Sequence, residues 1–351
     1  MMTDGSSSSN RVKERRVERG LTQAELAARA GISRTAVTAI EGAKLVPSVA
    51  TALSLAAALE CTVEDLFRPS TQATEVESWA WPPATNSTHC WQAEVSGRTL
   101  KYPAAATPML AALPDSSAVN SPNSSTDSRE TLVLACCDPA AGLLASQFQL
   151  ATGMRLIVIP RSSAQSLELL RQGLVHLAGL HLATADYPDR NVDAVRMELG
   201  NEYELLRLSH WQEGVALASS SRHRSVHSVL SAKLKWIGRE EGSGARQCLD
   251  QLLHSRRMPR CVAKNHLGVA SAIQSGWADA GVCVQLVCEE AGLRFIPVQK
   301  EAYDVCYANS FASDRRLKAF QSVVRSKAYR KLLSMLPGYD TSETGDTWSI
   351  R

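Results

Sequence analysis

The pattern of apolar and polar positions divides the chain into a helical first part and a longer part in which strands and helices alternate. Between residues 11 and 67, apolar residues recur at helical spacing in closely spaced segments. From residue 131, short apolar runs such as TLVLACC and MRLIVIP alternate with amphipathic segments such as SSAQSLELLRQG. This order predicts repeating β-α-β units, and therefore a mostly parallel sheet with helices on its faces.

The α/β part is long enough for two lobes. Residues 130–340 are at the upper edge of the size of a single lobe, and a second set of elements begins after Asn201. The segments LRFIPVQ and YDVCYANS predict two further strands, and closing helices are expected from Asp314 to Leu336. We therefore expect two α/β lobes that share a ligand cleft. Residues 341–351 are expected to form a tail.

The region between the two parts has the composition of a linker. Residues 69–129 contain WPPATNST and SSAVNSPNSSTDS, which are typical of turns and linkers. Between them, HCWQAEVSGRTLKYPAA alternates enough to suggest two strands around Ser96 and Gly97. The pattern predicts a small β-module over residues 79–113, while an extended linker that packs a few aromatic side chains remains the alternative.

The first strong motif lies in the helical part. Thr22 followed by Glu25 is the signature of a capping box, so a helix is expected to begin near Gln23. Gly31 makes a turn, and Ser33 can cap a second helix. A short helix, a glycine turn and a second helix with polar outward residues are typical of a helix-turn-helix.

Residues 10–68 resemble the lambda-repressor-like, Xre-type DNA-binding family. The shared residues are Leu21, Thr22, Gln23, Leu26, Ala27, Ala30, Gly31, Ser33, Val37, Ile40, Glu41, Gly42, Pro47 and Ser48, followed by VEDLF at 63–67. The resemblance implies that Gln23 binds phosphate and that the second helix reaches bases through Arg34, Thr35 and Thr38. Ile40 and Glu41 are interpreted as structural. A helical dimerisation or adaptor domain that has lost DNA binding is the alternative.

The charge distribution favours DNA binding at this domain alone. The chain has 351 residues and a formal net charge of +3, which is too small for a protein that coats nucleic acid. The segment RVKERRVERG is locally basic, and basic residues there would neutralise phosphates. The candidate DNA-contacting residues are Gln23, Ser33, Arg34, Thr35, Thr38 and Arg15.

Composition also indicates the compartment. The nine cysteines include no CxxC pair, so the sequence predicts neither a zinc site nor a disulfide framework, and all thiols are expected to be reduced. The first ten residues have no apolar core of a signal peptide, and no apolar stretch is long enough for a membrane span. A cytoplasmic, soluble protein without a membrane partner is expected.

Four loops in the α/β part lie where strands end and helices begin, the usual place for ligands in open α/β sheets. They are Asp138-Pro139, Arg161 to Ser163, Gly179 to His181, and Glu241 to Gly244. Serine hydroxyls and bare backbone amides at helix starts favour an anion, and two such helix ends that face one another would hold an oxyanion. The alternative is that the serines are only helix caps.

Residues 130–340 resemble the periplasmic-binding-protein-like domain that some regulators carry behind a helix-turn-helix, with relatives among molybdate-binding and other type II solute-binding proteins. The segments that carry the resemblance are CDPAAGLLA, SSAQSLELLRQGLVHLAGLHL, WQEGVALA, REEGSGARQCLDQLL, HLGVASAIQSGWADAGV and LPGYD. The resemblance implies anion contacts from Ser162, Ser163 and Ser243, and from Tyr303. The full set of candidate ligand-binding residues is Ser162, Ser163, His181, Ser243, Gly244, Arg246 and Tyr303.

Two departures complicate a molybdate site. Asp138 would place a carboxylate near a dianion, unless it caps the first helix. Arg161, Arg246, His181 and His266 offer more donors than a bare tetraoxyanion requires, although each histidine alone has a structural role as its alternative. A larger anionic metabolite or a pterin-like cofactor therefore remains open beside a molybdate-like oxyanion.

The sequence does not predict an enzyme. It has no GxSxG, HExxH or GxxxxGK[ST] motif, and Cys136 and Cys137 are interpreted as parts of an apolar strand and poor nucleophiles. We expect no catalytic residue, metal or cofactor. The prediction is a one-component transcriptional regulator, a homodimer that binds double-stranded DNA and senses a small anionic ligand. The alternative is a DNA-binding protein whose second domain is an enzyme or a ligand-free dimerisation scaffold.

Overall fold

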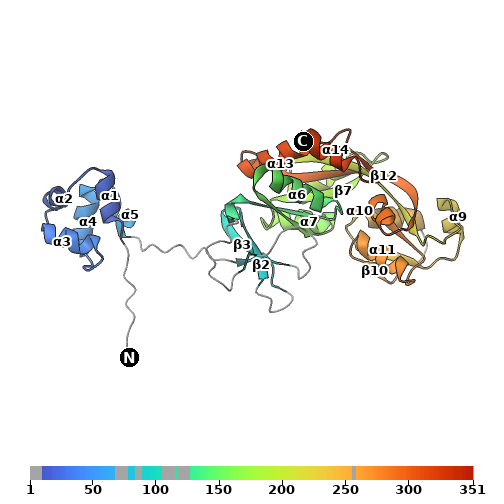
Figure 1. The fold of residues 1–351 in the computed structure, drawn as a ribbon, viewed down its shortest axis with the longest axis horizontal. Helices are drawn as coiled ribbons and strands as arrows, with labels where there is room; N and C mark the ends of the chain where they lie inside the picture. Colours follow the sequence, from blue (N-terminus) through green and yellow to red (C-terminus); the bar gives the residue numbers. More distant parts are fainter. Residues whose placement is uncertain are drawn as a thin grey trace, which may run out of the picture. The chain divides into compact units, whose positions relative to one another are not determined.

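The computed structural model describes residues 10–67, 78–83, 89–104, 115–116, 127–254 and 258–350. The chain forms two compact units, Met1–Val76 and Glu77–Arg351, and each is described by itself (Figure 1). The all-helical unit and the α/β unit agree with the predicted fold class.

The helical unit follows the predicted capping signals. Its helices are α1 (Val12–Glu18), α2 (Gln23–Ala30), α3 (Arg34–Glu41), α4 (Val49–Ala58) and α5 (Val63–Phe67). Thr22 and Glu25 form the expected capping box, and Ser33 accepts the amide N–H of Ala36 at the start of α3. Gly31, between the two helices, has a φ of +65°, a conformation that favours glycine. Thus α2, the glycine turn and α3 form the predicted helix-turn-helix.

A small sheet precedes the main α/β fold. Its strands are β1 (Ser78–Trp79), β2 (His89–Val95), β3 (Arg98–Pro103) and β4 (Asp115–Ser116), in the order β1-β3-β2-β4. The strands β2 and β3 are antiparallel and flank Ser96 and Gly97, as the alternation predicts. This sheet is not separate from the larger fold, because Tyr102 donates to the carbonyl of Leu174 at 2.7 Å and Arg155 pairs with Asp115 at 2.7 Å.

The large sheet is mixed. Its strands run in the order β10-β9-β11-β8-β12-β7-β5-β6, with β13 and β14 also paired to β8. The bounds are β5 (Thr131–Cys136), β6 (Arg155–Pro160), β7 (Leu177–Thr184), β8 (Tyr203–Leu217), β9 (Trp236–Arg239), β10 (Val262–Ala263), β11 (Ala280–Val284), β12 (Arg294–Ala308), β13 (Tyr339–Asp340) and β14 (Thr347–Ser349). Strands are parallel at both ends of the sheet, but β8 and β12 are antiparallel to their neighbours, so the expectation of a mostly parallel sheet is wrong.

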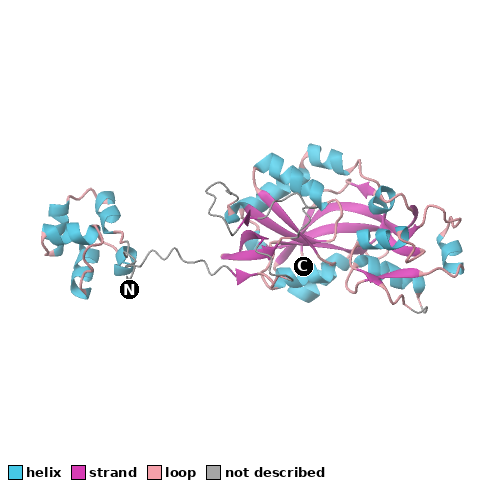
Figure 2. Ribbon diagram, turned by 60° about the horizontal axis from the view of Figure 1, so that its bottom comes forward, coloured by secondary structure: helices cyan, strands magenta, loops and turns pink. Residues whose placement is uncertain are grey.

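Helices cover the sheet in two groups that define two lobes (Figure 2). The first lobe contains β5–β7 with α6 (Ala141–Thr152), α7 (Ser163–Arg171), α8 (Arg190–Leu199), α13 (Arg315–Arg325) and α14 (Lys327–Leu333). The second lobe contains β9–β11 with α9 (Val226–Ser231), α10 (Gly244–Leu253), α11 (His266–Gln274) and α12 (Gln285–Glu290). Short 3₁₀ turns occupy Ser128–Glu130 and Asn309–Phe311. None of the helices in the described parts is long and apolar enough to cross a bilayer.

Two long strands join the lobes. The strands β8 and β12 have 15 residues each and pair along their whole length, from Tyr203 with Ala308 to Leu217 with Arg294. The sequence predicted two strands here, LRFIPVQ and YDVCYANS, separated by Lys300, Glu301 and Ala302. The strand instead continues through two register irregularities, and the charged side chain of Glu301 is buried between the lobes.

The residues expected to form a tail belong to the first lobe. The strand β14 pairs with residues 204–206 of β8, and Ile350 is only 3% exposed. Burial of this apolar residue and pairing of the strand give residues 347–350 a fixed place in the sheet, which the polar sequence around them did not indicate.

Candidate functional site

The helix α3 presents a polar, exposed face. Arg34, Thr35 and Thr38 are all exposed, as predicted for residues that reach bases. The hydroxyl of Thr38 donates to the carbonyl of Arg34 at 3.0 Å, and those of Ser33 and Thr35 lie 2.8 Å apart. These local bonds orient the hydroxyls on a face that stays exposed among the described residues.

A buried network holds the helices behind that face. The Nε of Arg16 donates to Glu41 at 2.6 Å, and the side-chain amide of Gln23 donates to the same carboxylate at 2.8 Å. Burial raises the pKa of Glu41, but these donors outweigh it and lower the pKa below its ordinary value. Glu41 is therefore structural, as predicted. The side-chain amide of Gln23 is bound to Glu41. A contact between Gln23 and a DNA phosphate stays a prediction. Arg15 pairs with Glu18 at 3.1 Å on a largely exposed surface.

A cavity of 660 Å³ lies between the two lobes of the α/β unit. Its first-lobe wall includes Cys137, Asp138 and Arg161, and its second-lobe wall includes Glu240, Lys264 and His266. The helices α6, α7 and α11 all begin at or beside this wall. Helix starts carry bare amide N–H groups and partial positive charge, so they favour an anion in the cavity.

The ionisable groups of the wall carry both signs. The guanidinium of Arg161 donates to the carbonyl of Pro160 at 2.8 Å and lies 4.8 Å from the ring centroid of Trp81. Burial raises the pKa of Asp138 to about 6, although its carboxylate accepts the hydroxyl of Tyr339 at 2.5 Å. Asp138 also accepts the amide of Ala140 at 2.9 Å, so it both lines the cavity and caps the approach to α6.

His266 brings a free donor to the same cavity. Its Nδ1 lies 3.0 Å from Nη1 of Arg239, which can only donate, so Nε2 carries the ring proton. Burial and Arg239 lower the pKa of His266 well below its ordinary value, which keeps the ring neutral. Its Nε2 has no hydrogen-bond partner among the residues that the structure describes, and the residue is 2% exposed.

The predicted serines are fully buried, and two of them are helix caps. Ser162 forms a capping box with Gln165 at the start of α7, and Ser243 accepts the amide of Arg246 at 3.1 Å at the start of α10. The hydroxyl of Ser163 accepts the backbone amide of His181 at 3.3 Å. Contact of these serines with a ligand stays a prediction, because their hydroxyls serve the fold in this structure.

The starts of α7 and α10 face one another, as predicted. They are in direct contact with each other in this structure. The amide of Ala164 donates to the carbonyl of Gly242 at 3.1 Å. Gly244 packs so closely that a Cβ there would lie 2.2 Å from the carbonyl oxygen of His181. The Nε of Arg246 pairs with Asp250 of its own helix at 2.7 Å, and its Nη1 donates to a backbone carbonyl, so its role as a ligand contact also stays a prediction.

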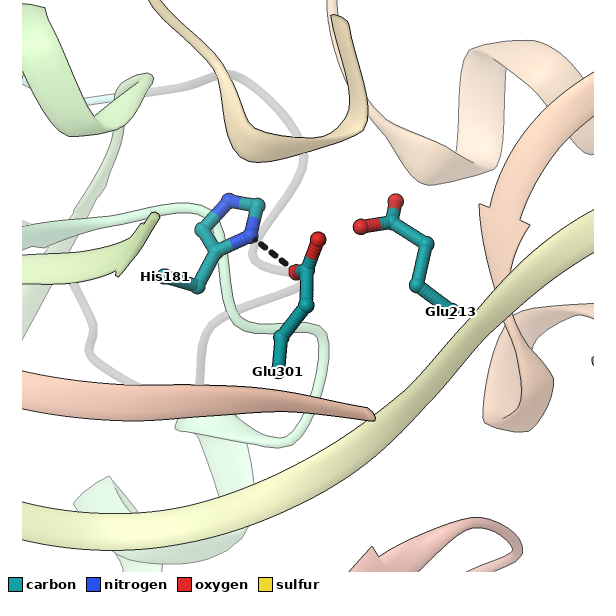
Figure 3. A group of neighbouring side chains, drawn as sticks. All are labelled: His181, Glu213 and Glu301. Atoms are coloured by element: carbon teal, nitrogen blue, oxygen red, sulfur yellow. Dashed lines mark hydrogen bonds and ion pairs between the residues drawn. The ribbon is translucent and has the colours of Figure 1, made fainter. Parts of the chain in front are cut away.

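His181 lies at the centre of a buried network, and Figure 3 shows it with Glu301 and Glu213. Its Nδ1 is 2.7 Å from Oε2 of Glu301, and its Nε2 is 2.9 Å from Sγ of Cys137. Glu301 also accepts Nε1–H of Trp211 at 3.0 Å and the side-chain amide of Gln299 at 2.7 Å. Sequence reasoning missed these partners. The polar stretch around Glu301 gave no sign of a buried carboxylate, and Cys137 was placed in a strand that ends at Cys136.

The charges of this network are set by burial and by contact. Burial lowers the pKa of His181, but Cys137 and Glu301 outweigh it and raise that pKa well above its ordinary value. Burial and the neighbouring charge of Glu301 raise the pKa of Glu213 well above its ordinary value. His181 and Glu301 therefore form an ion pair, and Glu213 carries a proton.

Three buried side chains bring metal-binding atom types together. His181, Glu213 and Glu301 each place one such atom within 4.8 Å of the others, and the two carboxylates face one another in Figure 3. Nδ1 of His181 and Oε2 of Glu301 already share a hydrogen bond, so an ion would have to displace its proton. We assign no metal to this group.

Tyr303 is buried under the same network. Its ring stacks on Trp211 with centroids 4.8 Å apart. A Cβ at Gly179 would lie 2.7 Å from the Tyr303 hydroxyl and 2.6 Å from Cβ of Cys136, so only glycine fits at this point of β7. Tyr303 thus supports the floor of the site, and direct contact with a ligand stays a prediction.

Comparison with known proteins identifies both units. Residues 145–325 match the model of the PBP superfamily domain, and residues 12–66 match a helix-turn-helix model. The chain is 27% identical over 229 residues to the uncharacterized protein YvgK of Bacillus subtilis (strain 168), covering 62% of this chain and 74% of that protein.

Solved structures with a similar arrangement are distant in sequence. A proposed phosphate ABC transporter substrate-binding protein from Clostridium perfringens, with bound phosphate, has a TM-score of 0.49 at 9% identity over 59% of this chain and 99% of that chain. The tungstate ABC transporter protein from Geobacter sulfurreducens has a TM-score of 0.46 at 13% identity over 59% and 98%.

Proposed function

Because the chain belongs to the PBP superfamily and carries a helix-turn-helix domain, we propose that it is a one-component transcriptional regulator whose interlobe cavity binds a small organic anion. The observation that carries the proposal is the cavity wall itself. Cations from both lobes, Arg161 and Lys264, line it together with His266, whose buried Nε2 has no partner among the described residues. The proposal assigns the domain to recognition rather than to catalysis.

The size and the polarity of the cavity support a metabolite over a bare tetraoxyanion. A volume of 660 Å³ is in the range of sites for small organic ligands. Asp138 and Glu240 on the wall disfavour a compact dianion, and they are suited to a ligand that also offers hydrogen-bond donors. A molybdate-like oxyanion is therefore the less favoured of the two ligand classes.

The proposed response is a change in how the two lobes close. A ligand held by residues of both lobes stabilises the closed arrangement by its differential affinity for that arrangement. In a homodimer, such closure would alter the placement of two DNA-binding domains. The proposal places the protein in the cytoplasm, where the DNA is accessible.

The test is a thermal-shift screen of the full chain against molybdate, tungstate, phosphate and a panel of carboxylate and phosphate metabolites. Stabilisation by an organic anion, followed by an altered affinity for operator DNA in its presence, supports the proposal. Stabilisation by molybdate or tungstate alone would return the ligand to the simple oxyanion class. No stabilisation by any anion, with DNA binding intact, would support a ligand-free scaffold instead.

A further inference from the structure

We infer that Cys137 is a nucleophilic thiol, activated by His181 and Glu301, that adds covalently to a carbon electrophile in the interlobe cavity. The inference goes beyond the proposed regulator, and its test requires neither DNA nor a reversible anionic ligand. It rests on one contiguous arrangement of three side chains and on the access that the cavity gives to the sulfur.

The three side chains are arranged as a nucleophile (Cys137), a base (His181) and a carboxylate that orients the base (Glu301). Sγ of Cys137 lies 2.9 Å from Nε2 of His181, and Nδ1 of the same ring lies 2.7 Å from Oε2 of Glu301. Both distances allow hydrogen bonds, and the relation of the groups is the one that activates thiols and hydroxyls in general. The chain positions of the three residues, 137, 181 and 301, lie on three different segments, so the sheet brings them together.

Glu301 is fixed as the orienting group. Its carboxylate accepts the indole N–H of Trp211 at 3.0 Å and the amide of Gln299 at 2.7 Å, besides its bond to His181. An acceptor held by several donors keeps Nδ1 of His181 protonated, so Nε2 is the nitrogen that exchanges a proton with the sulfur.

The sulfur of Cys137 is accessible, whereas most of the other thiols are buried. Cys137 is partly exposed and lines the cavity, whereas Cys283 and Cys306 are buried in the core. The 12-residue helix α6 begins at Ala141 just beyond it, and the positive end of that helix favours negative charge on sulfur. An independent sign of a ligand at this place is His266, whose buried Nε2–H is unpartnered among the described residues and whose side chain lines the same cavity.

Other ionisable groups face this pair from each neighbouring element. Asp138 follows Cys137 directly and Cys136 precedes it. Tyr303 approaches from β12, where burial and the neighbouring Cys136 and Asp138 raise its pKa well above its ordinary value. Glu213 and His266 lie on the other side of the imidazole. Burial opposes a charged ring, yet the contacts with Cys137 and Glu301 raise the pKa of His181 well above its ordinary value.

The proposed step is a conjugate addition. The sulfur of Cys137 donates an electron pair to the terminal carbon of a carbonyl-conjugated alkene, and an S–C bond forms. The π pair of the alkene shifts to the carbon beside the carbonyl, and that carbon takes the proton that the thiol gave to Nε2 of His181. No group leaves and no oxidant is consumed, so a small α,β-unsaturated carbonyl compound can react with Cys137 without any co-reactant.

The test uses N-ethylmaleimide, a member of that class, on the full-length protein at pH 6.5. Peptide mass analysis follows the labelling of Cys137 beside that of the exposed Cys261, which is an internal reference thiol. Cys137 is expected to react roughly ten-fold faster or more than Cys261. Labelling of Cys137 at or below the rate of Cys261, or no labelling, would overturn the inference.

Glu301 acts on Cys137 through His181. The pH dependence of the Cys137 labelling rate therefore distinguishes this role from a purely structural one. In Glu301→Gln, the Cys137 rate is expected to fall roughly ten-fold at pH 6.5 and to recover as pH rises to 8.5, while the wild-type rate changes less over that range. The matched control is Glu213→Gln, the same substitution at a buried carboxyl that already carries a proton, and its Cys137 rate is expected to match the wild type.

Two outcomes separate the alternatives. Equal loss of rate in both variants would assign the effect to general disruption of the buried cluster and overturn the inference. A wild-type rate that rises only after chelator removes a stoichiometric bound metal would make the cluster a metal site instead. If circular dichroism shows that Glu301→Gln does not fold, the labelling rates of Cys137 and Cys261 in the wild-type protein still test the inference.

Discussion

The backbone amide of Ala164, in the first turn of α7, donates to the carbonyl of Gly242, which leads into α10 of the opposite lobe, at 3.1 Å. Residues of the two lobes are therefore in contact at the helix starts for which the sequence predicted an anion site. Gly242 adopts a φ of +76°, and a Cβ there would lie 2.6 Å from that of Ala164. Contact between the lobes thus depends on glycine at position 242.

Gly244 gives the first test of that contact. In Gly244→Ala, the new Cβ would meet the carbonyl oxygen of His181 at 2.2 Å and Nδ1 at 2.5 Å, so the lobes must separate. We expect the free energy of unfolding of the α/β unit to fall by roughly 1–3 kcal/mol, measured by urea denaturation with tryptophan fluorescence.

Gly142→Ala is the control for that experiment. Gly142 lies inside α6, and a Cβ there meets no heavy atom within 4 Å. A gain of roughly 0.5–1 kcal/mol is expected, because alanine is the better helix former. If the two variants change stability alike, the close packing at Gly244 does not hold the lobes together.

Arg34 should determine operator specificity. Its side chain is exposed on α3, and we expect Arg34→Ala to lose roughly 1–3 kcal/mol at the operator and to relax discrimination among sequences. Fluorescence anisotropy with operator and unrelated DNA measures both quantities. Arg15→Ala is the comparison, for which we expect a uniform loss and a lower salt slope. Operator discrimination that survives in Arg34→Ala would contradict the assignment.

Arg161 should contribute to anion affinity. A neutral side chain in Arg161→Gln removes one cation from the cavity wall, and affinity for an anionic ligand should fall by roughly 1.5–3 kcal/mol in isothermal titration. The control is Arg171→Gln, which removes the same charge from the exposed end of α7, where it pairs with Glu168 at 2.6 Å. Equal affinities for the wild type and Arg161→Gln would exclude Arg161 from the site.

Asp138 should make stability depend on pH. Burial raises its pKa from 3.8 to about 6, so the folded state binds this proton more tightly than the unfolded state. The resulting contribution is fully present below about pH 4 and is lost as pH rises through 6, with a total of up to roughly 3 kcal/mol. The difference in unfolding free energy between wild type and Asp138→Asn, measured from pH 4 to pH 7, isolates this contribution from other carboxyls. A difference that does not change with pH would show that Asp138 has no raised pKa.

Local signals made part of this structure predictable. The capping residues Thr22, Ser33 and Ser162 act on amides three residues away, so a short sequence window contains the whole interaction. The site depends on contacts that no window contains. His181 and Glu301 are 120 positions apart, and their pairing requires that β12 continue through a polar stretch. Cys137 looked like a strand residue because it follows another cysteine in an apolar run, but β5 ends one residue earlier and leaves it on the cavity wall.

The path of the chain through its two lobes also sets an order in which they can form during synthesis. The elements α9 to α12 are consecutive, and the second lobe also needs residues 294–298 of β12, so it can form once residue 298 has left the ribosome. The first lobe cannot, because its sheet needs β12 and its last strand, residues 347–349, which pairs with residues 204–206. Nascent chains should therefore carry an ordered second lobe on an unfinished first lobe, with the cavity wall assembled last.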